Sequence, residues 1–268
     1  NEDINQVKSS RNFRGKVVLV TGSSSGIGEG IVKLFSILGA KVVVTGRKAA
    51  EVTRVAKEAQ ELSPKKEKPL EVVADVTKSD DLNRLMSETI KTFGRLDVLV
   101  NNAGIFKMAG IKDKRNFMKV FDQTIQVNLR PYLELIQLAI PHLEKTNGTI
   151  ISTSSRLSEN PVRMGMAYGI SKAGVDMMTK TLALELGPKI RVNAVNPGPT
   201  ESNLNSNTGF DPNIMNALMG QLMENTPLRR LGEPLDVAKA VVFLASSDAR
   251  FITGANINID GGLQAFAV

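Results

Sequence analysis

Tyr168 and Lys172 have the residue types and the spacing of a proton-transfer pair. They lie four residues apart in Ala-Tyr-Gly-Ile-Ser-Lys-Ala-Gly, at the start of a helix-like run at 169–186. Residues i and i+4 share one face of a helix, which places a phenol beside an ammonium. A nearby cation favours phenolate, so we expect Lys172 to lower the tyrosine pKa from about 10. Such a tyrosine can protonate an alkoxide forming from a carbonyl, or deprotonate an alcohol.

The same spacing occurs in ordinary amphipathic helices. Other features of the chain must therefore show whether Tyr168 and Lys172 form a proton-transfer pair. There is no cysteine, which excludes disulfides and thiolate–zinc sites. The one histidine, His142, leaves little room for a Ser-His-Asp triad, and we interpret it as a helix-end residue. We predict no metal site, and the search for acid–base groups turns to Tyr, Lys and the carboxylates.

Composition predicts a globular enzyme-sized protein. The chain has 268 residues, of which 42% are hydrophobic, and this fits one large α/β domain. No apolar stretch reaches the length of a membrane span, and the polar tail at 1–14 lacks the apolar segment of a secretory signal. We therefore expect a cytoplasmic protein with no membrane partner.

The excess of basic residues has two readings. The net charge is +7 and the pI about 9.6, as in some nucleic-acid-binding proteins. However, the basic residues are scattered and only 4% of residues are aromatic, so stacking platforms are scarce. We expect no nucleic-acid partner, and we attribute the charge to solvated loops with some attraction for an anionic cofactor.

Strand-like and helix-like segments alternate along the chain. Strands are predicted at 16–20, 42–45, 70–74, 96–101, 149–153, 191–196 and 256–259. Helices are predicted up to 38 after the first turn, and at 49–62, 80–93, 117–143 (with Pro131 and Pro141 as kinks or breaks), 169–186 and 234–245. The alternation predicts one α/β domain at 15–268, a doubly wound Rossmann-type fold with a parallel sheet of about seven strands and helices on both faces. The irregular stretch at 197–232 follows a strand, so it is expected to be a substrate loop or lid.

A glycine- and serine-rich turn, Thr-Gly-Ser-Ser-Ser-Gly-Ile-Gly at 21–28, joins the first strand to the first helix. Glycines let backbone approach a pyrophosphate closely, and the helix N-terminus presents unpaired N–H groups to that anion. The glycine spacing differs from G-x-G-x-x-G, and a tight structural turn is the alternative. The strand–turn–helix context favours dinucleotide binding.

The ends of the next two strands carry charged residues. NAD-selective sites often place a carboxylate after the second strand, whereas this chain has Arg47 and Lys48 there. Arg47 can pair with a 2′-phosphate, with Lys48 in support, which favours NADP(H) over NAD(H); a solvated surface arginine is the alternative. Asp75, before Val76 at the end of the third strand, can accept from an adenine amino group or begin a helix cap.

Several motifs in order give the chain a family resemblance. Two of these motifs are the 21–28 turn and the Tyr168/Lys172 pair. The others are Asn-Asn-Ala-Gly at 101–104, Asn128, Ser-Ser at 154–155, Asn-Pro-Gly at 196–198 and Asp-Gly-Gly at 260–262. Over about 15–262 the chain resembles the short-chain dehydrogenases/reductases. The resemblance implies hydride transfer between a nicotinamide cofactor and a carbonyl or secondary alcohol.

The resemblance also assigns catalytic roles. Tyr168 is the general acid/base, and Lys172 lowers its pKa and holds the nicotinamide ribose. Ser155, 13 residues before Tyr168, binds the carbonyl oxygen, while Ser154 caps the strand end. Asn128 bends its helix and holds a water that relays protons to Lys172. The chain thus resembles a carbonyl reductase, reversible as an alcohol dehydrogenase.

The cofactor site implied by the turn, the strand ends and the family pattern has many members. The family's Pro-Gly-x-x-x-Thr segment reads Pro-Gly-Pro-Thr-Glu-Ser at 197–202, so Ser202 takes the threonine position and Pro199 removes one N–H. The predicted cofactor-binding residues are Gly22, Ser24, Ser25, Gly26, Ile27, Gly28, Arg47, Asp75, Val76, Asn102, Ala103, Gly104, Tyr168, Lys172, Pro197, Gly198, Thr200 and Ser202.

Four further interpretations belong to this level. Met215, Met219 and Met223 form an apolar helical stripe, read as a packing face or alternatively as a flexible substrate lid. The partner is a small carbonyl or alcohol, among 3-oxoacyl thioesters, steroids, sugars, dicarbonyls and xenobiotic ketones. The resemblance implies a homotetramer paired through the helices at 117–143 and 169–186. The competing function is a catalytically silent nucleotide-sensing or scaffold protein of the same fold.

Overall fold

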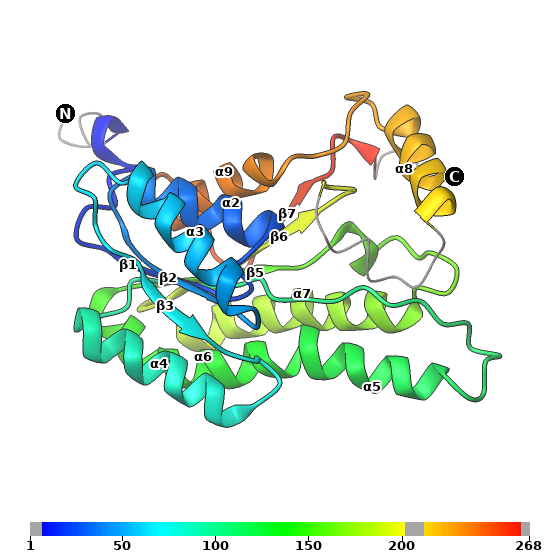
Figure 1. The fold of residues 1–268 in the computed structure, drawn as a ribbon, viewed down its shortest axis with the longest axis horizontal. Coiled ribbons are helices and arrows are strands. Elements are labelled where there is room, and N and C mark those ends of the chain that lie inside the picture. Colours follow the sequence, from blue (N-terminus) through cyan, green and yellow to red (C-terminus); the bar gives the residue numbers. More distant parts are fainter. Residues whose placement is uncertain (1–6, 202–211, 264–268) are drawn as a thin grey trace.

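Seven short strands form one parallel sheet in the computed structural model, which describes residues 7–201 and 212–263 (Figure 1). The spatial order is β3-β2-β1-β4-β5-β6-β7, and every neighbouring pair is parallel. The strands are β1 (Val17–Val20), β2 (Lys41–Gly46), β3 (Leu70–Val73), β4 (Val98–Asn101), β5 (Thr149–Thr153), β6 (Arg191–Pro197) and β7 (Asn256–Ile259). The predicted doubly wound, seven-stranded fold is confirmed.

Helices cover both faces of the sheet because successive strand residues point to opposite sides. Val18 and Val20 of β1 pack toward α2 (Gly26–Ile37), α3 (Ala49–Leu62) and α9 (Pro234–Ala245). Val17 and Leu19 pack toward α4 (Ser79–Phe93), α6 (Arg130–Leu143) and α7 (Met166–Leu186). Figure 1 shows these two helical layers above and below the sheet. Strands buried on both faces explain the near-continuous apolar runs of the sequence.

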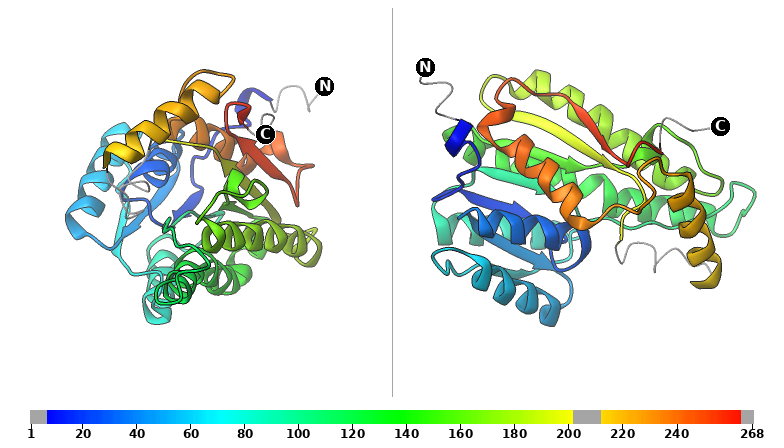
Figure 2. Two further views of the ribbon diagram at one scale, coloured as in Figure 1. Left: turned by 90° about the vertical axis from the view of Figure 1, so that its right-hand side faces the viewer. Right: turned by 90° about the horizontal axis from the view of Figure 1, so that it is seen from above.

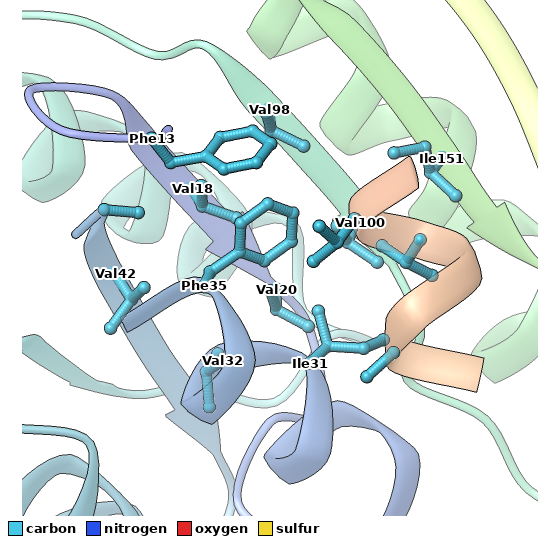
Figure 3. Packing of buried hydrophobic residues seen from close by; sticks show 14 of the residues in the cluster. Phe13, Val18, Val20, Ile31, Val32, Phe35, Val42, Val98, Val100 and Ile151 are labelled. Atoms are coloured by element: carbon cyan, nitrogen blue, oxygen red, sulfur yellow. The ribbon is translucent and has the colours of Figure 1, made fainter. Parts of the chain in front are cut away.

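An aromatic pair anchors the first layer. The rings of Phe13 and Phe35 meet edge to face, with centroids 4.9 Å apart, beside valines of β1 and β4 (Figure 3). Phe13 belongs to the segment expected to be an N-terminal tail at 1–14. It is buried, so the last part of that segment packs onto the domain core.

The helix predicted at 117–143 is two helices. α5 (Phe117–Asn128) ends at Asn128, Leu129 leaves helical geometry with φ −126° and ψ −55°, and α6 begins at Arg130. Pro131 explains the position of the break, because it lacks an N–H and its ring would clash with the carbonyl four residues earlier, so it is tolerated only in the first turn of a helix. Pro141 lies inside α6 without ending it. His142 lies in the last turn of α6, as expected of a helix-end residue.

The last part of the chain adds a helix that stands apart from the two layers. α8 (Pro212–Asn225) falls within the stretch expected to be irregular at 197–232, and Figures 1 and 2 show it beyond the edge of the helical layers. Short 3-10 turns are η1 (Val7–Ser9), η2 (Glu144–Thr146), η3 (Arg156–Ser158) and η5 (Ser247–Ala249). None of the helices in the described ranges is long and apolar enough to cross a membrane.

Candidate active site

The turn after β1 lies where the strand order reverses, between β1 and β4, the place at which doubly wound folds bind ligands. A Cβ on Gly22 would lie 2.9 Å from the Ala103 Cα, and one on Gly28 would lie 2.4 Å from the Gly22 carbonyl oxygen. Only glycine fits both positions. The Thr21 hydroxyl accepts hydrogen bonds from the amides of Asn102 and Ala103 at 2.9 and 3.1 Å, which locks the two turns together.

The first residues of α2, Gly26 and Ile27, line a cleft at this turn. Ser25 is the N-cap residue, in extended geometry, and its side chain makes no capping hydrogen bond. Gly46 ends β2 against this turn, because a Cβ there would lie 2.3 Å from the Ser24 hydroxyl oxygen. The N-terminal amides of α2 and the Ser25 hydroxyl are thus placed for an anion.

A cleft of about 610 Å³ runs from this turn to the start of α7. Its walls are the loops that follow β1, β2, β3, β4, β5 and β6, together with α7 and α8. Sixteen of the eighteen predicted cofactor-binding residues line it: Gly22, Ser24, Ser25, Gly26, Ile27, Arg47, Asp75, Val76, Asn102, Ala103, Gly104, Tyr168, Lys172, Pro197, Gly198 and Thr200. Gly28 lies behind the turn rather than in the cleft wall, and Ser202 lies outside the described residues.

Ser155, Tyr168 and Lys172 meet in one wall of the cleft. α7 begins at Met166, three residues earlier than predicted, so Tyr168 and Lys172 both lie on its first turns and both are buried. The Ser155 hydroxyl hydrogen-bonds the Tyr168 phenol, and it also accepts from the Leu157 amide at 3.1 Å. Lys172 Nζ donates to the Thr153 carbonyl oxygen at 2.7 Å. The adjacent Ser154 hydroxyl bonds the Lys172 carbonyl oxygen and ties α7 to the end of β5.

The electrostatics of this wall differ from the expected lowering of the tyrosine pKa. Burial raises the pKa of Tyr168 to about 12, and the Ser155 hydrogen bond opposes this only in part. Burial also lowers the pKa of Lys172 to about 7, against the opposing charge of Asp176. Desolvation disfavours the charged form of both groups, and at this depth it outweighs the Ser155 hydrogen bond at Tyr168 and the Asp176 charge at Lys172. Tyr168 is therefore a protonated phenol at neutral pH.

Asn128 is fully buried behind the cleft and joins three segments. Its Oδ1 accepts from the Ile105 amide at 2.8 Å, and its Nδ2 donates to the Ile105 carbonyl oxygen at 2.9 Å and to the Ser171 hydroxyl at 3.2 Å. The residue that ends α5 thus fixes both the loop after β4 and the first turns of α7. The end of α5 also releases that helix's last carbonyls from helical hydrogen bonding, as the predicted water-holding role requires.

A buried polar pair, Asp176 and Asn196, supports the turn that bears Ser155. Asp176 accepts from Asn196 Nδ2 with both carboxylate oxygens, at 3.3 and 3.1 Å. The same amide group contacts the Ser155 carbonyl oxygen at 3.3 Å and the Ser158 hydroxyl at 3.1 Å. Asp176 and Asn196 therefore hold the turn of η3 that orients Ser155, while the Asp176 charge favours protonated Lys172.

The two charged strand ends face the same part of the cleft. Arg47 is exposed and lines it. Burial of Asp75 acts to raise its pKa, but the hydrogen bonds from Thr77 and, to a smaller extent, the charge of Arg47 lower the pKa overall. Asp75 is not a helix cap, because Lys78 takes the N-cap position of α4. Its Oδ1 instead accepts from the amide and the hydroxyl of Thr77 at 3.0 and 2.8 Å.

Several residues at the site escaped the sequence reasoning. Phe106 packs its ring on Tyr168 with centroids 4.6 Å apart, and it lies two residues after the Asn-Asn-Ala-Gly turn. Asp176 carried a usable signal, since it continues the four-residue spacing of Tyr168 and Lys172 along one helix face. Arg156 also lines the cleft, and only its position after Ser155 pointed to it.

The apolar stripe of α8 is not a plain packing face. Leu218, Met219 and Leu222 line the cleft, so this part of the stripe covers the end that contains Tyr168. Met223 is 40% exposed, and nothing is described of the Met215 side chain. The alternative reading of the stripe, a flexible apolar cover for substrate, is the one that this geometry favours.

A doubly wound parallel sheet with a cleft at its switch point defines a Rossmann-type α/β protein. Comparison with known proteins identifies the family within that class. Residues 22–264 match the family profile described as enoyl-(acyl carrier protein) reductase. Mouse (Mus musculus) L-fucose dehydrogenase is 40% identical over 94% of this chain and 89% of its own length. The 3-oxoacyl-(acyl-carrier-protein) reductase of Thermotoga maritima is 38% identical over 94% of this chain and 98% of its own.

Solved structures agree. A 7α-hydroxysteroid dehydrogenase, complexed with NADH and 7-oxo glycochenodeoxycholic acid, is 31% identical, with a TM-score of 0.86 over 95% of this chain and 96% of its own. The Brucella melitensis 3-ketoacyl-(acyl-carrier-protein) reductase, complexed with NADH, is 34% identical, with a TM-score of 0.83 over 94% and 99%. The chain belongs to the short-chain dehydrogenase/reductase family, and its relatives are oxidoreductases that use nicotinamide cofactors.

Proposed function

We propose that the protein is an NADP(H)-dependent carbonyl reductase, reversible as an alcohol dehydrogenase. The observation that carries this is the convergence of the Ser155 hydroxyl, the Tyr168 phenol and the Lys172 amine in the wall of one cleft. Two neighbouring hydroxyls can each turn to donate to a single carbonyl oxygen. The raised pKa of Tyr168 keeps its phenol protonated at neutral pH, which suits proton donation during reduction.

The other end of the cleft fits a dinucleotide. Glycine at 22 and at 46 lets the turn pack closely against Ala103 and brings the end of β2 against Ser24, which shapes this end of the cleft. The start of α2 and the Ser25 hydroxyl suit the pyrophosphate, and Lys172, beside Gly104, suits the nicotinamide ribose. When bound there, the nicotinamide ring supplies or accepts the hydride.

The chain's own groups then have separate roles. Ser155 orients the carbonyl oxygen and stabilises negative charge on it, and Tyr168 transfers the proton to it. Lys172 holds the ribose and, when protonated, favours phenolate in the reverse direction. Asn128 holds the loop after β4 and α7 in register, and a water that relays protons to Lys172 would be held at the helix end that Asn128 forms.

Replacing Tyr168 by Phe tests the activity. Phe keeps the ring that packs on Phe106 but lacks the hydroxyl, so carbonyl-dependent oxidation of NADPH should fall by about 10²–10⁴-fold, with cofactor affinity retained. The chain's other tyrosine gives a matched control: Tyr132 is buried in the core, and its hydroxyl donates to the Ala103 carbonyl oxygen at 2.9 Å. Tyr132→Phe should keep activity within about tenfold. A Tyr168→Phe variant as active as that control would remove Tyr168 from the mechanism.

Arg47 carries the proposed choice of cofactor. Its guanidinium lines the cleft just beyond β2, where it can form charge-assisted hydrogen bonds with a 2′-phosphate. Two related structures contain NADH, so NAD(H) is the alternative. Arg47→Asp should weaken NADPH binding by about tenfold or more and favour NADH, measured by fluorescence titration. Lys57→Asp, at an exposed position of α3 outside the cleft lining, is the control. Tighter binding of NADH than NADPH by the wild type would overturn the assignment.

The competing function is a catalytically silent nucleotide-sensing or scaffold protein. Such a protein has no need for a buried phenol and amine, whose desolvation costs stability, beside a hydroxyl in an open cleft. A panel of carbonyl compounds with NADPH and NADH separates the two. Cofactor binding without turnover of any compound would favour the silent protein.

A further inference from the structure

Arg156 is a cation in the substrate end of the cleft for which the surrounding protein gives little compensation. It directly follows Ser155, begins η3 and lines the cleft. Among the charged residues that line the described cleft, Arg47 and Asp75 lie at the far strand ends, leaving Lys172 and Arg156 near the reacting groups. Lys172 has a pKa of about 7, so Arg156 provides the permanent positive charge there.

The surroundings of this guanidinium are unusual for an arginine. Its Nε is buried and has no hydrogen-bond partner among the described residues, and its side chain enters no ion pair within 4.0 Å in those residues. Burial lowers the pKa of Arg156, and the charge of Asp260 offsets this only in part. A partly buried cation without a close counter-charge is costly, and an anionic ligand would relieve that cost.

The rest of this end is apolar. Leu157, Pro161 and Val162 lie on the loop that follows Ser155, and Leu218, Met219 and Leu222 face it from α8. One permanent cation in an apolar pocket selects a ligand with one anionic group on an apolar body. Arg156 directly follows Ser155 and both line the cleft, so a group held by Arg156 shares the substrate end with a carbonyl held by Ser155.

We propose that Arg156 is the specificity residue of this site and binds a carboxylate of the substrate, so that the preferred substrate is an apolar oxo acid whose carboxylate lies within a few bonds of the reacting carbonyl. This rests on the proposed reductase function. A guanidinium binds a carboxylate through two parallel charge-assisted hydrogen bonds, whereas an uncharged ester offers only weaker acceptors. The neutral members of the carbonyl classes, such as unmodified sugars and simple ketones, would leave the cation uncompensated.

The test compares apolar oxo acids with their own methyl esters. Aryl and alkyl 2-oxo and 4-oxo acids and their esters are assayed for NADPH oxidation with the wild type, Arg156→Met, Arg156→Lys and Arg163→Met. The wild type should favour acid over ester in kcat/KM by about tenfold or more. Arg156→Met should bring that ratio to about one while ester turnover changes by less than about threefold. Arg156→Lys should retain part of the preference for the acid, because lysine keeps the positive charge but lacks the two parallel N–H donors of a guanidinium.

Arg163→Met is the matched control, since Arg163 is exposed on the same loop and does not line the cleft. It should keep the acid preference of the wild type. A wild type that prefers the ester, or an acid preference that survives in Arg156→Met, would overturn the inference and leave Arg156 as a structural partner of Asp260.

A binding measurement separates this inference from the proposed function. The same acids and esters are titrated by calorimetry into protein with NADP⁺, which cannot reduce them. Tighter binding of acids to the wild type, lost in Arg156→Met, supports the carboxylate site even where no compound is turned over. In that case the reductase function fails and the site stands. Equal binding of acids and esters overturns the site, whatever the turnover.

Discussion

At Tyr168 and Lys172, burial decides the ionisation states and reverses the simplest expectation from sequence. An ammonium beside a phenol at helical spacing predicts a phenol with a lowered pKa. In the folded protein both groups are desolvated, so the phenol is held protonated and the amine is easily deprotonated. The wall of the cleft is therefore prepared for proton donation, and proton abstraction from an alcohol should become easier as pH rises.

The lowered pKa of Lys172 makes stability depend on pH. Its folded pKa of about 7 lies below the ordinary value of 10.5, so between these pH values the unfolded chain binds more protons. The stability contribution of Lys172 should therefore rise with pH through this window, by up to about 1.4 kcal/mol per pH unit, and be flat below it. The measurement is urea unfolding of wild type and Lys172→Met, without ligand, at pH 6, 7, 8 and 9.

The difference between the two proteins isolates Lys172 from the other titrating groups, including Tyr168, whose raised pKa acts only above about pH 10. A difference in unfolding free energy that stays constant from pH 7 to 9 would contradict the lowered pKa. Exposed Lys180 on the same helix serves as a control, because Lys180→Met should show no such trend.

At the scale of elements, α7 and the end of β5 are held in register by buried polar groups rather than by apolar packing alone. Asn128 ties α7 to the loop after β4, and Asp176 with Asn196 ties it to the turn that bears Ser155. Buried polar groups cost stability unless their hydrogen bonds are made, so such pairs specify one arrangement of the elements they join.

Asp176→Asn tests this link. The variant replaces a charged acceptor of the Asn196 amide by a neutral one, so we expect a loss of about 1–3 kcal/mol in urea unfolding. It also removes the charge that favours protonated Lys172, so the Lys172 pKa should fall further. The pH profile of kcat should shift accordingly, which a purely structural role would not produce. Asp122→Asn, at an exposed acid on α5, is the control and should alter neither.

At the scale of the whole molecule, α7 carries apolar side chains on two sides. Val175 and Met178 are buried toward the sheet, whereas Met177 is 63% and Leu184 86% exposed. Ile170 of α7 and Leu133 of α6 add to the exposed apolar set. A helix on one face of a sheet needs a single apolar stripe, so a second one indicates a further contact.

We propose that the protein is a homotetramer paired through these helices. Light scattering at micromolar concentration should give a mass about four times that of the 29.0 kDa chain. Met177→Glu should reduce the mass, while Lys180→Glu at an exposed polar position of α7 should not. A wild type that has the mass of one chain with NADPH present would rule out the tetramer.

The sequence by itself determined the layers of the fold and most of the cleft. Apolar strands alternating with amphipathic helices allow few arrangements other than a doubly wound parallel sheet, and that topology brings the loops after the strands to one edge. Residues directly after strands, such as Gly22, Arg47 and Ala103, could therefore be assigned to one cleft before any coordinates were known.

Tertiary structure decided what depends on burial and on contacts between distant segments. The pKa values of Tyr168 and Lys172 follow from depth in the protein, which local spacing does not reveal. The Asp176–Asn196 pair joins a helix to a strand 20 residues away, and Arg156 matters through the absence of a close counter-charge in the described cleft. Only the tertiary structure shows that α8 faces the cleft. An apolar helical stripe has the same sequence pattern whether it packs on the protein core or on a ligand.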